Sequence, residues 1–414
     1  MDIRSMAQNS RHAARALAVL GTKEKNQILE AMAVALESRK EEVFEANKID
    51  VAAGKAAGLS EALVDRLIIN EARMDGMKDG LRTMISLSDP VGEIESGWKL
   101  ENGIHASRIR VPIGVVGMIY ESRPNVTVDA SGLALKSGNS IILRGGKEAI
   151  ETNKALANIL GEAGVAAGMP GGAVQLISDT NRDLVQELIT MDDLVDVIIP
   201  RGGQGLKKAI VAKASVPVII TGAGLCHIYV DENADLDMAV PIIKNAKIQR
   251  PGVCNAIETL LVHKAVDPHW IESLVKELED QGVDVIGCEK IKAIAPQVTL
   301  ATDEDWSTEY LALKISIRMV DDIDMAMDHI ELYGTRHSES ILTENIQAAE
   351  KFLNGVDASA VYVNASTRFT DGSVFGFGGE IGISTQKLHA RGPMGLQALT
   401  TTKYVLRGQG QIRV

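Results

Sequence analysis

The first hundred residues repeat apolar and polar positions with the period of a helix. Apolar side chains recur at spacings of three and four residues, as at Ile28, Met32 and Leu36. This spacing places them on one face of an α-helix. Charged runs such as 39–42 lie between them and are typical of solvated surface. The pattern predicts that residues 5 to about 95 form a helical layer that packs on another part of the molecule.

From residue 108 the pattern becomes that of strands. Residues 108–111 alternate polar with apolar, as in a half-exposed strand. Residues 113–119 form a continuous apolar run, as in a strand buried on both faces. Apolar runs then alternate with stretches of helical period, which predicts a parallel α/β sheet whose ligands bind at the carboxyl ends of its strands. The predicted strands are 140–143, 173–177, 196–199 and 216–220, and the helices lie near 149–163, 181–190 and 204–213.

A second series of the same kind begins after about residue 228 and predicts a second α/β domain. Residues 402–407 at the end of the chain predict one more strand. The strands of the second series are 260–262, 283–286, 315–320, 340–342 and 360–363, with helices at 268–280, 323–331 and 345–354.

Composition narrows the class of protein. Aromatic residues make up only 3% of the 414 residues and the net charge is −12, which argues against a nucleic-acid stacking platform and a broad polyanion-binding surface. Three cysteines are too few for a disulfide framework, so a reducing compartment is expected. No apolar run reaches the ~18 residues that span a bilayer. With no signal-like apolar segment at the N-terminus, these features predict a cytoplasmic protein that binds no membrane.

Cys254 is the first candidate for chemistry. It lies in a segment of small and turn-forming residues, Gln249 to Glu258, just before an apolar run. A thiolate on a tight loop is a strong nucleophile, but a buried structural cysteine would suit this segment equally well. Cys226 and Cys288 are expected to be structural. The chain lacks the spaced His, Cys and Asp motifs of metal sites, so no metal is expected.

Glycine-rich loops follow several of the predicted strands. Gly202 and Gly203 open a helix, where backbone N–H groups could approach a phosphate. Thr221 and Gly222 give a weaker signal of the same kind, and a simple tight turn remains an alternative for both loops. A third loop carries two cations that suit an anionic ligand, with a solvated surface turn as the alternative; the cations are Arg144 and Lys147.

Two further polar side chains suit ligand binding. Asn125, after a proline, could donate to an oxyanion, although turn formation alone would explain it. His337 has basic and hydroxyl neighbours suited to a carboxylate or a phosphate, whereas a lone histidine is often merely exposed or satisfied in the core.

The order of these segments is more specific than any one of them. The segment from Pro112 to Tyr120, which leads to Asn125, is similar to the first strand of the aldehyde dehydrogenase superfamily and its oxyanion asparagine. Cys254 falls where that superfamily keeps its nucleophile. Longer segments along nearly the whole chain resemble one branch of it, which reduces L-glutamyl 5-phosphate; they are 221–227, 245–256, 333–339, 363–369 and 389–395.

The resemblance implies a fold of two Rossmann-like parallel-sheet α/β domains and a small β oligomerisation flap. It implies a homo-oligomer, with glutamate kinase, the enzyme upstream, as a candidate partner. The expected ranges are 1–97 and 113–228 for a cofactor-binding domain to which 386–399 returns, 229–385 for a catalytic domain with the nucleophile, and 98–112 and 400–414 for the oligomerisation strands.

The resemblance also implies an activity, the NADPH-dependent reduction of L-glutamyl 5-phosphate to the 5-semialdehyde in proline biosynthesis. Cys254 would form a thioester and Asn125 would hold the oxyanion. Thr221 stands where hydrolytic relatives carry a general-base glutamate, which suits an enzyme that must preserve its thioester. Glu309 resembles the glutamate that holds the nicotinamide ribose, and the region of Arg144 and Lys147 resembles the one that meets the adenosine ribose.

For the substrate phosphate we expect Arg123, Arg250 or Arg368, because guanidinium binds phosphate through two hydrogen bonds. His337 and Asn364 are the candidates for the amino and carboxylate end of the substrate. Two alternatives stay open. A relative that passes the acyl group to coenzyme A would also lack the general-base glutamate, and a non-catalytic oligomeric relative could keep the fold.

Overall fold

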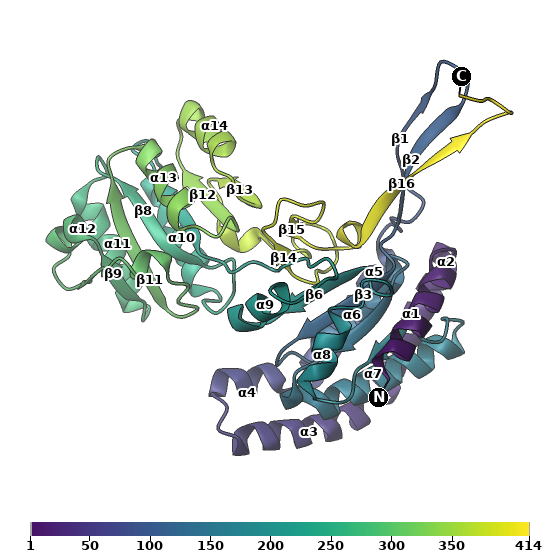
Figure 1. The fold of residues 1–414 in the computed structure, drawn as a ribbon. Helices are drawn as coiled ribbons and strands as arrows, with labels where there is room; N and C mark the ends of the chain where they lie inside the picture. Colours follow the sequence, from purple (N-terminus) through teal and green to yellow (C-terminus); the bar gives the residue numbers. More distant parts are fainter. Residues whose placement is uncertain (1, 414) are drawn as a thin grey trace.

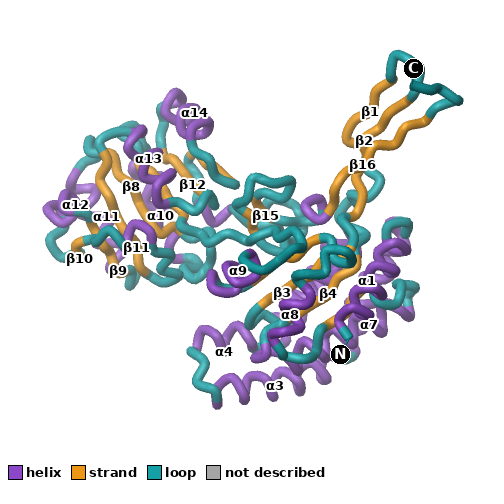
Figure 2. Tube along the Cα trace, viewed as in Figure 1, coloured by secondary structure: helices purple, strands orange, loops and turns teal. Residues whose placement is uncertain are grey.

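The computed structural model describes residues 2–413 and consists of two α/β bodies and a projecting β-sheet. Figure 1 shows the two bodies side by side, with the sheet extending from the body that contains the N-terminus. The strands form one central sheet in each body and a separate ribbon outside them (Figure 2). The arrangement therefore agrees with the predicted α/β fold.

The first body is built on a four-stranded parallel sheet in the order β5-β4-β3-β6. Its strands are β3 (Val115–Tyr120), β4 (Ser140–Arg144), β5 (Val174–Leu176) and β6 (Val197–Arg201). Its helices are α1 (Ile3–Leu17), α2 (Thr22–Ser38), α3 (Lys40–Ala56), α4 (Glu61–Leu67), α5 (Glu71–Ser86), α6 (Asn125–Lys136), α7 (Ile150–Ala166), α8 (Arg182–Leu188) and α9 (Gln204–Val211).

Both faces of this sheet are covered, which explains why its strands read as continuous apolar runs. Successive side chains of a strand point to opposite faces. Val116 and Met118 of β3 therefore pack with α2, α5, α6 and α7, whereas Val115 and Ile119 pack with α1 and α8. The helical layer predicted from the first hundred residues forms five separate helices. Of these, α1 packs directly on the sheet, whereas α2, α3 and α5 pack on α6 and α7.

The strand predicted at 216–220 is wrong as an element. Only one isolated bridge, between Ile198 and Val218, joins it to the sheet. Pro217 explains the interruption, because proline has no N–H to donate to a ladder and is confined to sheet edges. The segment still lies along β6, where Ile198 donates to the carbonyl of Pro217 at 2.8 Å.

The second body contains a seven-stranded parallel sheet in the order β10-β9-β11-β8-β7-β12-β13. Its strands are β7 (Cys226–Val230), β8 (Ile257–His263), β9 (Asp284–Gly287), β10 (Thr299–Leu300), β11 (Lys314–Val320), β12 (Ser338–Leu342) and β13 (Ala360–Val363). The helices are α10 (Leu236–Ile248), α11 (Pro268–Asp280), α12 (Glu289–Ile294), α13 (Ile323–Tyr333) and α14 (Ile346–Gly355). The strand β7 and the helices α10 and α12 were not predicted.

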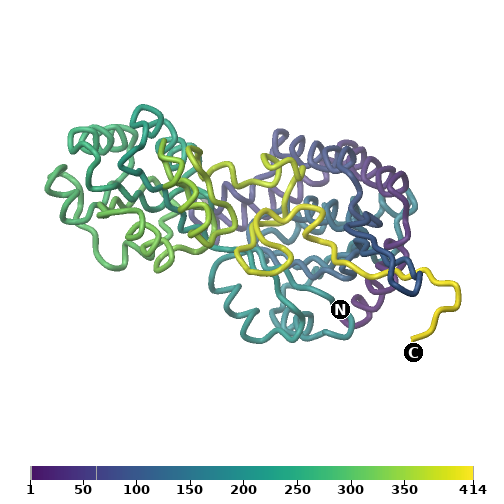
Figure 3. The backbone as a smooth tube through the Cα atoms, turned by 90° about the horizontal axis from the view of Figure 1, so that it is seen from above, coloured from purple at the N-terminus to yellow at the C-terminus, as the bar shows by residue number. Residues whose placement is uncertain are grey.

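The chain passes between the two bodies twice. It leaves the first body after α9 and the segment 216–220, and it returns through residues after β13, where β14 (Ile383–Ser384) pairs with β15 (Gly392–Pro393). A bridge joins Thr221 on the outward path to Ser384 on the return path. Leu396 and Leu399 then pack into the core of the first body. Figure 3 shows this last part of the chain, in yellow, running past the first body towards the C-terminus.

The projecting sheet is antiparallel and combines segments far apart in the sequence. Its strands are β1 (Ile94–Lys99), β2 (His105–Pro112) and β16 (Thr400–Arg407), in the order β1-β2-β16. In Figure 1 it extends away from both bodies, and Trp98, Tyr404 and Leu406 of this sheet are exposed. Within residues 2–413, no helix is both long and apolar enough to cross a bilayer.

Candidate active site

Cys254 lies in the loop between α10 and β8 and is half-buried. The two ends of this loop are joined by a buried ion pair. Nζ of Lys247 donates to the carboxylate of Glu258 at 2.6 Å and to the carbonyl of Ile257 at 2.9 Å, and both charged side chains are fully buried. The Cys254 loop is therefore held across its base from inside the second body.

A glycine-rich segment from the outward path of the chain forms the other wall of this loop. A side chain at Gly224 would overlap the backbone of Cys254, so the close approach requires glycine. The Sγ of Cys226, at the start of β7, donates to the carbonyl of Cys254 at 3.1 Å. Cys226 is buried, as expected of a structural cysteine, but it supports the candidate nucleophile directly.

Glu309 contacts the same glycine-rich segment, at Gly224. Its Oε1 accepts a hydrogen bond from the backbone N–H of Gly224 at 2.7 Å. The neighbouring N–H of Leu311 donates to Oε1 of Glu258 at 3.1 Å, and Leu311 has a φ of 53°. The buried Lys247–Glu258 pair therefore holds the Glu309 loop as well as the Cys254 loop.

The acidity of the Cys254 thiol reflects opposing effects. Burial raises its pKa above the ordinary value, and the guanidinium of Arg201 opposes this. The carboxylates of Glu380 and Glu309 add to the increase, and Arg123 opposes it. The free thiol is therefore mainly protonated near neutral pH in this conformation, and nearby cations favour its ionisation.

Asn125 lies in the first turn of α6, at the carboxyl end of β3, and is exposed. Its Nδ2 donates to the carboxylate of Asp129 at 2.9 Å, which leaves its second amide hydrogen available for a ligand. Burial raises the pKa of Asp129 to about 6. Asp129 therefore orients the amide that is expected to hold the oxyanion.

The predicted coenzyme residues follow the strands of the first sheet. Nη2 of Arg144 donates to the carbonyl of Thr180 at 2.9 Å, while its buried Nε has no partner. Lys147 is exposed. These groups could meet an anionic part of a nicotinamide coenzyme, and the half-buried carboxylate of Glu309 could accept from ribose hydroxyls. The donor set therefore fits such a coenzyme.

The two glycine loops use some of their donors within the protein. The N–H of Gly203 donates to Oε2 of Glu121 at 2.8 Å, and a side chain at Gly202 would overlap the same carboxylate. The hydroxyl of Thr221 donates to the carbonyl of Pro200 at 3.1 Å, and Gly222 packs against Thr385. A phosphate at the start of α9 would therefore have to displace the Glu121 carboxylate.

The three arginines predicted to bind the substrate phosphate differ in what they contact. Among residues 2–413, the side chains of Arg123 and Arg250 have no hydrogen-bond or ion-pair partner. Arg123 is half-buried, and burial lowers its pKa to about 10. Arg368 instead donates to Gln249 at 2.9 Å and to the side chain of Asn255, and so supports the nucleophile loop.

The positions of His337 and Asn364 do not suit direct contact with a substrate. His337 is fully buried beside Ser338 and Cys226, and burial lowers its pKa to about 3. Both ends of the Asn364 amide are bonded to the backbone of Thr343, at 2.9 Å each. These side chains hold the end of β12 in place, which their polar neighbours in the sequence could not indicate.

Sequence reasoning also missed charged residues around Cys254. Arg201 and Lys207 flank the glycine loop at the start of α9, and Glu380 lies on the return path of the chain. Burial raises the pKa of Glu380 to about 7, and its Oε2 accepts from the N–H of Gly372 at 2.9 Å. The signal for Arg201 was present, because it ends a buried strand, but only the glycines after it were considered.

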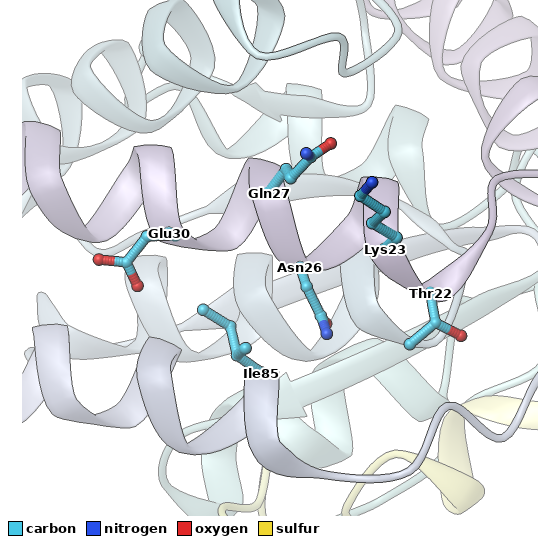
Figure 4. Close-up of a pocket in the computed structure, with 6 residues that line it drawn as sticks. All are labelled: Thr22, Lys23, Asn26, Gln27, Glu30 and Ile85. Atoms are coloured by element: carbon cyan, nitrogen blue, oxygen red, sulfur yellow. The ribbon is translucent and has the colours of Figure 1, made fainter.

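Two further observations concern other parts of residues 2–413. No group of three or more His, Cys, Asp and Glu side chains in this range could hold a metal ion. Figure 4 shows a hollow lined by one residue of α5 and the outer side of α2, which contains none of the candidate site residues. The lining residues are Ile85, Thr22, Lys23, Asn26, Gln27 and Glu30.

Comparison with known proteins gives consistent matches. A sequence model described as the aldehyde dehydrogenase family matches residues 1–305. The gamma-glutamyl phosphate reductase of Moorella thermoacetica is 57% identical over 413 residues, which covers 100% of this chain and 99% of that one. The enzyme of the same name from Halothermothrix orenii is 54% identical and covers 98% and 97% of the two chains.

Comparison with solved structures gives matches of the same kind. The crystal structure of gamma-glutamyl phosphate reductase from Thermotoga maritima has a TM-score of 0.98 at 50% identity and covers 100% of both chains. An acetylating aldehyde dehydrogenase from Geobacillus thermoglucosidasius has a TM-score of 0.71 at 20% identity, with 100% of this chain and 97% of that one covered. The second likeness is one of fold alone.

Proposed function

We infer the function of this chain from its family: it belongs to the aldehyde dehydrogenase family and, within it, to the gamma-glutamyl phosphate reductases. We propose that it reduces L-glutamyl 5-phosphate to L-glutamate 5-semialdehyde and phosphate with NADPH. The observation that carries the assignment to this chain's residues is the position of Cys254. Its thiol is half-buried on a loop held from both sides, with cations nearby. This is the setting expected of a nucleophilic cysteine.

The first step uses Cys254. Its thiolate attacks the carbonyl carbon of the acyl phosphate, a carbon–sulfur bond forms, and the carbon–oxygen bond to the phosphoryl group breaks. Phosphate leaves with the electron pair of that bond, and a thioester remains. Asn125, oriented by Asp129, and the backbone N–H of Cys254 would donate to the oxyanion of the tetrahedral intermediate. One such donor typically contributes ~3 kcal/mol.

In the second step the coenzyme supplies a hydride to the thioester carbonyl when it is bound. Glu309 would hold the nicotinamide ribose, since its carboxylate is fixed by Gly224 beside Cys254. Arg144 and Lys147 would meet the 2′-phosphate that distinguishes NADP from NAD. As the aldehyde carbonyl forms again, the carbon–sulfur bond breaks and Cys254 leaves as the thiolate. The one proton that the overall reaction consumes ends on the released phosphate.

Protection of the thioester from water follows from Thr221. Its hydroxyl is buried and donates to the carbonyl of Pro200, and a neutral hydroxyl is too weak a base to take a proton from an attacking water. A chain with a general base here would lose its intermediate to hydrolysis. This supports reduction of the thioester as the reaction.

The test is the reverse reaction. We expect reduction of NADP with glutamate 5-semialdehyde to require phosphate, and we expect Cys254→Ala to abolish turnover with the fold intact by circular dichroism. A Cys288→Ala variant is the matched control, because this half-buried cysteine lies on the far side of β11 from the nucleophile loop and should keep its activity. Full turnover by Cys254→Ala would refute the thioester.

The same assay separates the coenzyme A alternative. If coenzyme A supports NADP reduction and phosphate does not, the substrate is an acyl-coenzyme A instead. A folded chain that turns over neither substrate would favour the non-catalytic relative. The proposal also includes a homo-oligomer joined through the projecting sheet, and docking of the upstream kinase, which would hand over the labile acyl phosphate.

A further inference from the structure

Lys207 is a buried cation without a partner of opposite charge. It is only 8% exposed, and its Nζ has one long contact, 3.5 Å, to the carbonyl of Gly222. No ion pair to it is formed within the described residues. Burying an ammonium group without a carboxylate is costly, so the position calls for a negatively charged ligand.

Arg201 is a second cation of this kind and comes from the end of β6. It pairs in register with Tyr120, at the end of β3, so its side chain and that of Arg123 leave the same edge of the sheet. Its backbone carbonyl accepts from the N–H of Glu121 at 3.1 Å. Within residues 2–413 its half-buried guanidinium has neither a hydrogen-bond nor an ion-pair partner.

The guanidinium of Arg201 lies over the glycine-rich wall of the site. A side chain at Gly382 would come within 3.1 Å of its Nη1 and would overlap the methyl group of Thr221. From Thr221 the chain continues to Gly224, which packs against Cys254. Arg201 and Lys207 therefore approach the nucleophile from the side of the first body.

The acidic groups nearby do not neutralise these cations. Glu309 and Glu121 accept hydrogen bonds from the backbone N–H groups of Gly224 and Gly203, and neither forms an ion pair with Arg201 or Lys207. Burial lowers the pKa of Lys207, and the charge of Arg201 lowers it further. Two cations that interact with each other and have no ion-pair partner among residues 2–413 are typical of a site for an anionic ligand.

The geometry points to Arg201 and Lys207, together with Arg123, as the site that binds the phosphoryl group of the substrate. This inference rests on the proposed function, because it assigns the leaving group of that reaction to particular side chains. The ligand class is a phosphate with two negative charges next to a carbonyl. Of these three side chains, Arg123 was expected from the sequence to bind the substrate phosphate, whereas Arg201 and Lys207 were not.

This arrangement gives the cations two roles in one reaction. Before substrate binds, they favour the thiolate of Cys254 electrostatically. As the carbon–oxygen bond breaks, negative charge collects on the departing phosphate, and guanidinium and ammonium groups fixed beside it stabilise that charge. Arg201 and Lys207 would then be catalytic residues that touch the reacting group.

The test uses inorganic phosphate as the probe and alkylation of Cys254 as the readout, so it does not depend on turnover. Phosphate should protect Cys254 of the wild-type protein from iodoacetamide in a saturable way. Arg201→Gln and Lys207→Met should each raise the phosphate concentration for half-protection about tenfold or more, because a charge-assisted hydrogen bond is lost. Lys208→Met is the matched control, since Lys208 is the next residue of α9 but is exposed.

A second measurement separates this site from the coenzyme site. NADP affinity, measured by fluorescence, should stay within about twofold of wild type in both variants, while the KM for phosphate in NADP reduction rises. Unchanged protection in Arg201→Gln and Lys207→Met would overturn the assignment. So would a loss of NADP affinity with phosphate protection intact, which would place these cations at the coenzyme.

Two further variants cover a failure to fold. Arg201→Lys and Lys207→Arg keep the charge and should retain most of the protection. If the two side chains had a purely structural role that depended on their shape, protection would be lost in these variants as well. If the protein does not use glutamate semialdehyde at all, NADP reduction fails but phosphate protection can still be measured. Failure of the proposed function is thereby distinguished from failure of this inference.

Discussion

The thiol of Cys254 is buried among groups of both charges, and its pH dependence can be predicted residue by residue. Burial raises its pKa, Arg201 and Arg123 oppose the increase, and Glu380 and Glu309 add to it. Lys207 and Arg368 are also close enough for the thiolate to affect their own pKa values. We expect alkylation of Cys254 in the free protein to keep accelerating with pH beyond the range where an exposed thiol is fully ionised.

Charge-removing variants should shift this profile in opposite directions. Glu380→Gln should lower the midpoint, because Glu380 is ionised above about pH 7 and disfavours the thiolate. Arg123→Gln should raise it. Glu272→Gln, on the exposed side of α11, is the control and should leave it unchanged. Alkylation rates followed by mass spectrometry measure this, and a midpoint raised by Glu380→Gln would contradict the assignment of charges.

Gly224 allows a prediction on packing. Gly224→Ala should destabilise the protein by about 1–3 kcal/mol and reduce activity strongly, because the new methyl group overlaps the backbone of Cys254. Gly161→Ala, in the interior of α7 with open space around it, should instead stabilise by up to about 1 kcal/mol. Urea unfolding and NADP reduction check both. A neutral Gly224→Ala would show that the two loops can separate freely.

For single residues, the sequence predicts a functional role where the neighbouring residues form a recognisable segment. It misses residues whose role depends on contacts with distant parts of the chain. Cys254 and Asn125 lie in recognisable segments, and the structure gives each a setting that suits its expected chemistry. His337 and Asn364 have equally polar neighbours in the sequence but face inward or bond to the backbone. Lys207 could not be identified, because its burial depends on how α9 packs on residues that follow it.

Among the elements, the loop carrying Cys254 depends on the buried pair of Lys247 and Glu258. Removing one partner, as in Lys247→Ala or Glu258→Ala, should cost about 3–5 kcal/mol, because the remaining charge stays buried. The double variant Lys247→Met with Glu258→Leu should recover most of that stability, since a packed apolar pair avoids the desolvation cost.

The same double variant tests positioning. Glu258 also accepts from the N–H of Leu311, so losing it should raise the KM for NADP even when stability is recovered. Glu258→Gln keeps an acceptor for Leu311 and should retain more coenzyme affinity than the double variant. If stability and KM are both restored in the double variant, the pair has a structural role alone.

Elements with a clear helical period or a continuous apolar run were predictable, and those interrupted by proline or by polar residues were not. The runs at 140–143 and 196–199 became β4 and β6 within a residue or two at each end. The run at 216–220 is equally apolar, but Pro217 limits it to one bridge. The strand β7 was missed because Cys226 and His227 break its apolar pattern, although every residue of it is buried.

For the whole molecule, the projecting sheet predicts assembly. Tyr404 and Leu406 are 63% and 56% exposed, and the ring of Trp98 lies 6.1 Å from that of Tyr404. We expect a second copy of the chain to cover these side chains. Deleting residues 403–414 should yield monomers in sedimentation velocity.

A gentler variant controls for damage to β2. Tyr404→Glu combined with Leu406→Glu leaves the backbone pairing of β16 in place and should also favour monomers. An unchanged oligomer in both proteins would contradict assembly through this sheet.

For the molecule as a whole, the sequence predicted two α/β bodies and the outlying strands from their differing periods. Which of the outlying strands pair with one another came only from the structure.

The double passage of the chain between its bodies also bears on how the protein matures during translation. The strands of the second body come from one continuous stretch, 226–363, whereas the core of the first body includes Leu396 and Leu399 near the end of the chain. Domains generally fold as units as the ribosome releases them. The second body can therefore finish folding while the first still lacks its closing segment. Asn125, the residue expected to hold the oxyanion, lies in the first body, so a nascent chain becomes competent for chemistry only in the last moments of its synthesis.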